Sequence, residues 1–148
     1  MKKINVDLDA VRKRAAYLFL EERYACSEAV LTAMNEALGS PLSEEAMRVA
    51  TGFRGGMGDG DVCGAISGGI MVLGLVMAPD YPGTPSPELK EAAKALRARF
   101  AAHNDALDCA DLTARFPSMN DPARRVMCGE LVEGVVSDLV DIFDKSLS

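Results

Sequence analysis

Histidine is almost absent from this chain, which contains one, His103, among 148 residues. General acid–base catalysis usually relies on histidine or on carboxylates with shifted pKa values, and the carboxylates here occupy positions typical of solvated faces and helix caps. An excess of basic residues is also lacking, because 16 Lys and Arg stand against 22 Asp and Glu and give a net charge of -6. Binding to nucleic-acid phosphates or to an anionic membrane surface depends on Lys and Arg. The composition therefore excludes nucleic acid as a partner and electrostatic docking on membranes.

The chain also lacks a long uninterrupted apolar run. Residues 62–79 come closest, but four glycines interrupt them and they are too few to span a bilayer. At the N-terminus two lysines are followed by polar and acidic residues rather than by the apolar segment of a signal peptide. We therefore predict no membrane insertion and a cytoplasmic location.

No Cys-x-x-Cys pair is present, which excludes by spacing a zinc knuckle and a thioredoxin-type motif. Structural disulfides are unusual in the cytoplasm, so the four cysteines need another explanation. They are Cys26, Cys63, Cys109 and Cys128. Their wide spacing still allows them to converge in the folded protein.

No run with strand periodicity appears, and apolar residues recur at helical spacing along most of the chain. We predict one all-α domain over residues 1–148, a bundle of five to six helices. The expected helices cover approximately residues 8–22, 27–38, 44–51, 63–77, 87–103 and 121–145, with a short turn or helix at 109–115. Ser27 and Asp61 are predicted N-caps. His103 prolongs the inward stripe of its helix, and we interpret it as a core or edge residue.

Five glycines lie between residues 52 and 60, immediately before Cys63. Glycine is entropically costly on folding, so such a loop is expected to serve tight turns or the close approach of backbone to a bound group. With Asp61 as N-cap, Cys63 lies in the first helical turn, where free amides and the helix dipole favour a thiolate. Asp59 and Asp61 would oppose that effect, and Arg54 would support it.

The glycine loop lacks the Lys-Ser/Thr ending of a phosphate-binding P-loop. Its amides could instead donate hydrogen bonds to a bound cofactor. The candidate cofactor-binding residues are Gly56, Gly58, Gly60 and Gly64. The alternative is that these glycines only form turns and a small-residue packing face.

The four cysteines differ in their predicted surroundings. Cys26 and Cys128 extend the inward faces of their helices, whereas Cys63 lies near a helix start and Cys109 follows a break. A buried cysteine alone is more often a small apolar residue than a reactive one. If the helices pack as one bundle, however, the four can meet in pairs or as a set.

The chain resembles the C_GCAxxG_C_C family of redox-active proteins. The resemblance runs from about Tyr24 to the C-terminus and rests on residues 26–30, the glycine run, residues 63–68 and the single cysteines Cys109 and Cys128. It implies a redox role for the four cysteines, with Gly64, Ala65 and Gly68 as a supporting turn. A related module occurs in split-Soret cytochromes, but no C-x-x-C-H site is present here and haem is not implied.

Three functions remain open at this point. The first is thiol–disulfide oxidoreductase chemistry, with Cys63 as the attacking thiolate, Cys26 as the resolving thiol and a redox partner that the sequence does not identify. The second is electron transfer through an iron–sulfur cluster or zinc held by Cys26, Cys63, Cys109 and Cys128. The third is a non-catalytic helical interaction module, such as a homodimer, whose cysteines fill the core.

Overall fold

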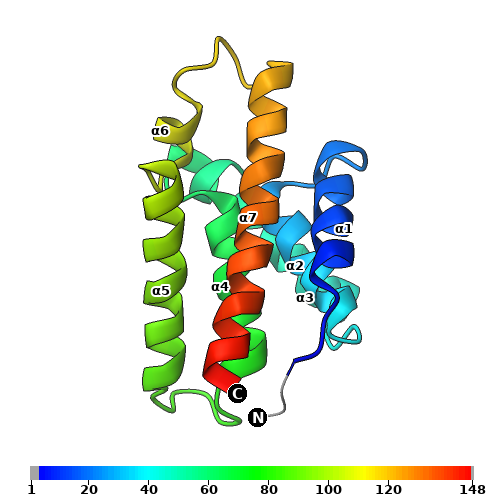
Figure 1. Cartoon of the computed structure of the whole chain (residues 1–148), viewed down its shortest axis with the longest axis vertical. Helices are drawn as coiled ribbons and strands as arrows, with labels where there is room; N and C mark the ends of the chain where they lie inside the picture. Colours follow the sequence, from blue (N-terminus) through cyan, green and yellow to red (C-terminus); the bar gives the residue numbers. More distant parts are fainter. Residues whose placement is uncertain (1–3, 148) are drawn as a thin grey trace.

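A computed structural model describes residues 4–147, and these residues form α-helices joined by short loops (Figure 1). The described part contains no β-strand beyond one isolated bridge. Its seven α-helices are α1 (Leu8–Leu20), α2 (Cys26–Ala37), α3 (Glu44–Arg48), α4 (Gly64–Met77), α5 (Pro87–Asn104), α6 (Cys109–Thr113) and α7 (Pro122–Leu147). The all-α prediction is confirmed. The predicted count of five to six was too low, because the five-residue α6, expected only as a short turn or helix, is a separate helix.

Several helix starts follow directly from the capping residues in the sequence. The Asp7 carboxylate accepts a hydrogen bond from the amide of Ala10 at 3.2 Å and caps α1. The Ser86 hydroxyl accepts one from Leu89 at 3.3 Å and caps α5, whose first residue is a proline. Each cap satisfies an amide that the first helical turn leaves without a partner.

Two predicted caps were wrong. α2 begins one residue earlier than expected, so Ser27 lies inside the helix, where its buried hydroxyl donates to the carbonyl of Ala50 at 2.8 Å. Asp61 does not cap α4, because its carboxylate accepts instead from the amide of the next residue, Val62, at 2.7 Å. The N-cap position of α4 is occupied by Cys63.

The long helix α7 organises the bundle by packing against α1, α2, α4 and α5 (Figure 1). Every position of α7 that the sequence predicts to face inward is buried: Cys128, Leu131, Val132, Val135, Leu139, Ile142 and Phe143. Burial of this apolar stripe removes it from water and is the main source of stability in such a helix. None of the described helices combines the length and the apolar character that crossing a membrane requires.

α2 and α4 approach each other through a glycine face. A Cβ atom built on Gly68 would lie 2.6 Å from the carbonyl oxygen of Ser27, a backbone atom that cannot move independently of α2. A Cβ on Gly64 would lie 3.2 Å from the Ser27 nitrogen. The predicted close approach of another backbone to this face is thus explained by α2 of the same chain.

Replacing Gly68 by alanine is expected to lower the free energy of unfolding by roughly 1–3 kcal/mol, because the added methyl group forces the two helices apart. Gly74 on the same helix is the matched control, since a Cβ atom added there would have no neighbour within 4 Å. Gly74→Ala is expected to be neutral or stabilising by up to about 1 kcal/mol through helix propensity. Urea unfolding of both variants checks this, and equal effects would contradict the packing explanation.

Candidate functional site

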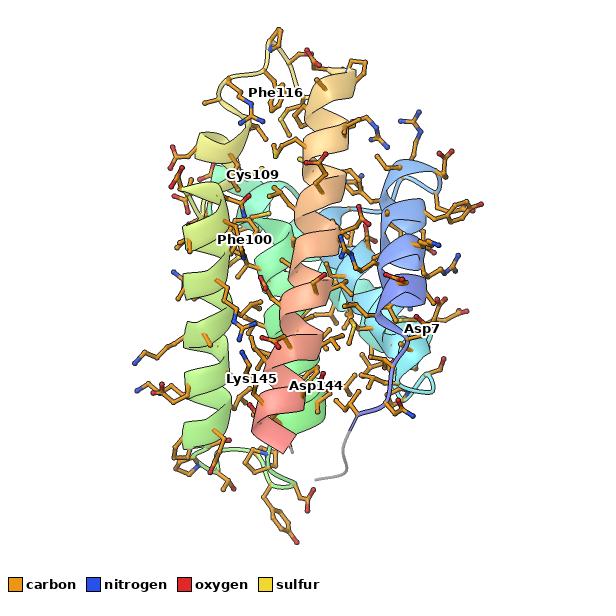
Figure 2. The ribbon with its side chains drawn as sticks, viewed as in Figure 1. Asp7, Phe100, Cys109, Phe116, Asp144 and Lys145 are labelled. Atoms are coloured by element: carbon orange, nitrogen blue, oxygen red, sulfur yellow. The ribbon has the colours of Figure 1, made fainter. Side chains whose placement is uncertain are left out.

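All four cysteines line one cavity of about 400 Å³. Cys26 is the first residue of α2, Cys63 directly precedes α4 and Cys109 is the first residue of α6. Figure 2 shows Cys109 at the end of the bundle from which the first turns of α7 project. Cys128 lies on the second turn of α7, and all four are free thiols. The structure therefore brings together every cysteine that the sequence selected.

Glycines allow the cysteine-bearing segments to approach one another. A Cβ on Gly64 would lie 3.5 Å from the Cβ of Cys26, and a Cβ on Gly56 only 2.7 Å from the Cβ of Cys109. Gly56 also has a φ of +72°, in the left-handed region that side chains disfavour. The small residue beside each cysteine is what permits close contact between the segments.

The start of α2 is anchored by its own polar side chains. The Glu28 carboxylate accepts from the amide of Ala25 at 2.9 Å and from the hydroxyl of Thr51 at 2.8 Å. Together with the Ser27 hydroxyl on the Ala50 carbonyl, these bonds fix Cys26 against the 3₁₀ segment η1 (Val49–Phe53). Ser27 and Glu28, which follow Cys26 in the sequence motif, therefore serve to position Cys26.

Backbone hydrogen bonds join the segments that carry Cys63 and Cys109. The amide of Cys63 donates to the carbonyl of Leu107 at 2.8 Å, and the amide of Cys109 donates to the carbonyl of Asp61 at 2.7 Å. They flank the antiparallel bridge between Val62 and Asp108. Cys63 and Cys109, which are far apart in the sequence, are thus held in a fixed position relative to each other.

Cys26 lines the cavity together with Cys63 and Cys128, and it is the thiol whose pKa responds to both of them. These two neighbours, together with burial, raise the pKa of Cys26 well above that of an ordinary thiol. A thiol has a single proton, so a protonated Cys26 donates it to one neighbouring sulfur at a time and stabilises the thiolate form of that neighbour. Cys26 is therefore the proton donor of a three-sulfur group.

The same hydrogen bond from Cys26 lowers the pKa of Cys128 to about 6, with further help from Arg124. The Arg124 Nη1 lies 3.6 Å from the Cys128 sulfur. A nearby guanidinium favours the charged form of a thiol. The surroundings of Cys128 therefore favour its thiolate form.

The pKa of Cys63 is lowered as well, first by the hydrogen bond from Cys26 and next by the backbone amides of Ala65 and Ile66, while burial opposes them. The predicted effect of helix-start amides on this thiol is present. Burial raises the pKa of Cys109, and the neighbouring Cys63 and Cys128 raise it further. Cys109 is thus in the cavity but outside the group of three interacting thiols.

Arg124 was not identified from the sequence. The available signal is its spacing, because residues four apart on a helix lie on the same face, and Arg124 precedes Cys128 by one such step. The arginine Arg54, expected to favour a thiolate, also lines the cavity, whereas Asp59 and Asp61 do not. The acidic residues before Cys63 are therefore outside its immediate surroundings.

Only two of the four candidate cofactor-binding glycines line the cysteine cavity. Gly56 and Gly64 form part of the cavity wall, and Gly58 and Gly60 lie outside it. In the described chain, no three side chains among His, Cys, Asp and Glu are arranged to hold a metal ion. The zinc or cluster site considered from the sequence stays a prediction.

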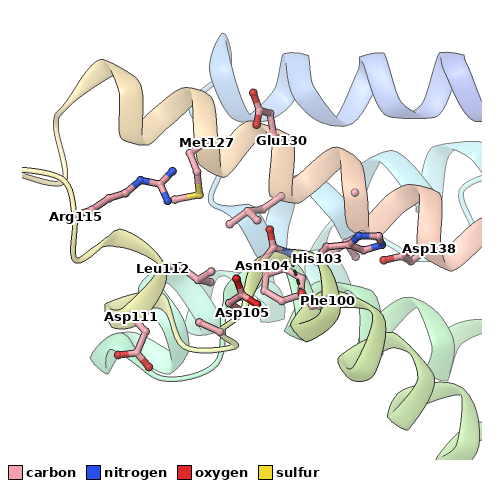
Figure 3. Close-up of a pocket in the computed structure, with 14 residues that line it drawn as sticks. Phe100, His103, Asn104, Asp105, Asp111, Leu112, Arg115, Met127, Glu130 and Asp138 are labelled. Atoms are coloured by element: carbon pink, nitrogen blue, oxygen red, sulfur yellow. Dashed lines mark hydrogen bonds between the residues drawn. The ribbon is translucent and has the colours of Figure 1, made fainter.

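A second cavity, of about 440 Å³, contains no cysteine (Figure 3). Its lining includes His103, which is exposed, and four carboxylates: Asp105, Asp111, Glu130 and Asp138. Figure 3 shows His103 from α5 beside Asp138 from α7. Burial raises the pKa of Asp138, and His103 counteracts this. His103 is accordingly an edge residue that does not line the cysteine cavity.

Comparisons with known proteins agree with this site. An uncharacterized protein of Archaeoglobus fulgidus is 29% identical over 133 residues, which cover 84% of this chain and 87% of that protein. No solved structure matches the chain significantly. The family described as "Putative redox-active protein (C_GCAxxG_C_C)" matches residues 24–142, a range that contains all four cysteines. The chain therefore belongs to the C_GCAxxG_C_C family.

Proposed function

We propose that the protein carries out thiol–disulfide exchange in the four-cysteine cavity, with Cys26 as the resolving thiol. The observation that supports this most directly is that one cavity holds Cys26 together with Cys63 and Cys128, the two thiols that raise the pKa of Cys26. Exchange requires a thiolate next to a second thiol, and these three side chains provide that pairing. The proposal assigns the protein to the cytoplasm, where free thiols persist.

The reaction begins at Cys128, the thiol with the strongly lowered pKa. Its thiolate attacks one sulfur of a disulfide RSSR, breaks the S–S bond, forms a mixed disulfide with that sulfur and releases RS⁻. Cys26 then loses its proton to the released RS⁻ and attacks the sulfur of Cys128. A Cys26–Cys128 disulfide forms and the second RS⁻ leaves, so two protein thiols are oxidised and one substrate disulfide is reduced.

Cys63 can take the place of Cys128, because its sulfur also contacts Cys26 and its pKa is also lowered. This is the role that the sequence predicted for it. Cys109, whose pKa is raised, then remains a thiol in either route. Peptide mapping of the oxidised protein distinguishes the two routes, since it shows which sulfur joins Cys26.

The test is oxidation of freshly purified, anaerobic protein with a small disulfide, followed by thiol counting and peptide mapping. We expect four thiols before oxidation and two after it, with Cys26 in the new intramolecular disulfide. The Cys26→Ser variant is expected to stop at the mixed disulfide on Cys128. Cys109→Ser is the matched control and is expected to behave like the wild type, with one thiol fewer.

Two results would overturn the proposal. One is that every thiol of the folded protein is inert toward small disulfides, or that Cys26 is absent from every disulfide formed; this would favour the interaction module. The other is stoichiometric iron with sulfide, or zinc, in the anaerobic protein, together with loss of the metal in Cys63→Ser. That outcome would favour the electron-transfer or structural-metal alternative.

A further inference from the structure

We propose that the cysteine cavity selects small thiols and disulfides that carry carboxylate or similar anionic groups, an inference that rests on the proposed exchange activity. The proposal concerns the class of substrate rather than the reaction. It depends on the charge of the cavity wall and on the hydrogen-bonding state of its arginines. One of these arginines, Arg124, also lowers the pKa of Cys128.

The cavity is basic although the protein is acidic. Four arginines line it: Arg23, Arg54, Arg124 and Arg125. None of the described residues in its lining is an Asp or Glu, whereas the chain as a whole has a net charge of -6. The second cavity has the opposite character, with four carboxylates and one arginine. The positive charge is therefore concentrated where the cysteines are.

Arg125 is already engaged in the fold. One of its Nη atoms donates to the carbonyls of Phe19 at 3.1 Å and Leu20 at 3.0 Å, and its guanidinium lies over the Phe19 ring at 5.3 Å. It joins the end of α1 to α7. We therefore assign Arg125 a structural role and do not include it among the groups that bind substrate.

Arg124 is only partly engaged. One Nη atom contacts the Cys128 sulfur and the other donates to the carbonyl of Met119. Its Nε is buried and has no hydrogen-bond partner within the described chain. A buried donor without a partner is costly, so Arg124 is less fully satisfied by the protein than Arg125 is.

Arg54 and Arg23 are exposed residues of the cavity lining, and within residues 4–147 neither forms an ion pair. Guanidinium groups bind carboxylates with two parallel hydrogen bonds. An anionic group held by Arg54 or Arg124 leaves the sulfur of the same small molecule free to reach Cys128. Phe19 and Leu131, also in the lining, provide apolar surface for its methylene groups.

The experiment compares three disulfides of similar size that differ in net charge: dithiodipropionate (dianionic), hydroxyethyl disulfide (neutral) and cystamine (dicationic). Each rate of protein oxidation is divided by the rate of the same disulfide with free mercaptoethanol, which removes intrinsic differences in reactivity. We expect the normalised rate of dithiodipropionate to exceed that of cystamine by about tenfold or more at low salt, and the advantage to shrink as salt is added.

Arg54→Gln is expected to reduce the rate with dithiodipropionate severalfold more than it reduces the rate with hydroxyethyl disulfide. Arg97→Gln is the matched control, because Arg97 is an exposed arginine on α5 outside the cavity lining; it is expected to have little effect. A second measurement uses wild-type protein alone. Adipate, which has two carboxylates and no sulfur, is expected to slow alkylation of the cavity thiols by iodoacetamide, and butanediol is not.

Failure of this inference differs from failure of the proposed function. If all three disulfides oxidise the protein at equal normalised rates and adipate gives no protection, substrate selection by charge is wrong and the exchange activity stands. Equal losses in Arg54→Gln and Arg97→Gln would also overturn it, since net charge rather than the cavity would then decide. If no disulfide oxidises the protein, the proposed function fails, and protection by adipate then tests anion binding separately.

Discussion

Alanine in place of Cys26 is expected to lower the thiolate fraction of Cys128 at pH 7 about tenfold. The Cys26 thiol is the largest contribution to the lowered pKa of Cys128, and Arg124 is the next favourable one. If loss of the donated proton raises that pKa by about two units, the thiolate falls from roughly nine-tenths to one-tenth of the protein. The thiolate exists above the pKa and disappears as the pH falls through it. Alkylation of Cys128 should therefore be half-maximal near pH 6 in the wild type and near pH 8 in the variant.

The measurement is the rate of iodoacetamide labelling at Cys128 across this pH range, read from peptide masses. Cys26→Ser is expected to give an intermediate profile, because a hydroxyl still donates a hydrogen bond. Cys109→Ala removes a thiol from the same cavity without removing a hydrogen bond to Cys128, and its profile is expected to match that of the wild type. Equal shifts in Cys26→Ala and Cys109→Ala would show that the cavity as a whole, rather than the Cys26 contact, determines the acidity.

The second large effect concerns Gly56. A Cβ at this position would lie 2.3 Å from the carbonyl oxygen of Asp61 and 2.8 Å from its nitrogen, both backbone atoms. The Gly56 carbonyl also accepts the Asp61 amide at 2.8 Å. The left-handed conformation adds about 1–2 kcal/mol for alanine, and the overlap adds about 1–3 kcal/mol. Gly56→Ala is therefore expected to lower the free energy of unfolding by roughly 3 kcal/mol or more.

Gly58 offers a close control, because it has the same φ of +72° and a Cβ added to it would meet nothing within 4 Å. Gly58→Ala is expected to cost only the conformational part, about 1–2 kcal/mol. Urea unfolding of both variants gives the comparison. Should Gly58→Ala prove as destabilising as Gly56→Ala, backbone conformation alone would explain the glycine loop, and the contact with Asp61 would be unimportant.

The helices could be predicted from the sequence because their determinants are local. The carboxylate of Asp7 and the hydroxyl of Ser86 cap the helices that follow them, and the apolar stripe of α7 is buried as its periodicity indicated. α6 was harder, because a helix of five residues has almost no periodicity. Ser27 was misassigned because its hydroxyl has a distant partner, the Ala50 carbonyl, which no local pattern reveals.

The site was predictable only in part for the same reason. Residue type and helical phase selected Cys26 and Cys128 as inward-facing, and the structure brings both into one cavity with Cys63 and Cys109. The sequence indicated Cys63 as the attacking thiolate, whereas Cys128 has the pKa of about 6. The low pKa of Cys128 depends on its interactions with Cys26 and with Arg124. The interaction with Cys26 is set by packing between helices, and periodicity along one helix does not contain that information.

The separation of Cys26 and Cys128 along the chain has a thermodynamic consequence. A covalent link between the first residue of α2 and the second turn of α7 would enclose about 100 residues, which includes most of the bundle. Closing a loop of that size restricts the unfolded ensemble by on the order of 4 kcal/mol. The oxidised protein would then melt at a markedly higher temperature than the reduced one. The oxidation state of the two cysteines would therefore determine how well the protein resists heat and proteolysis.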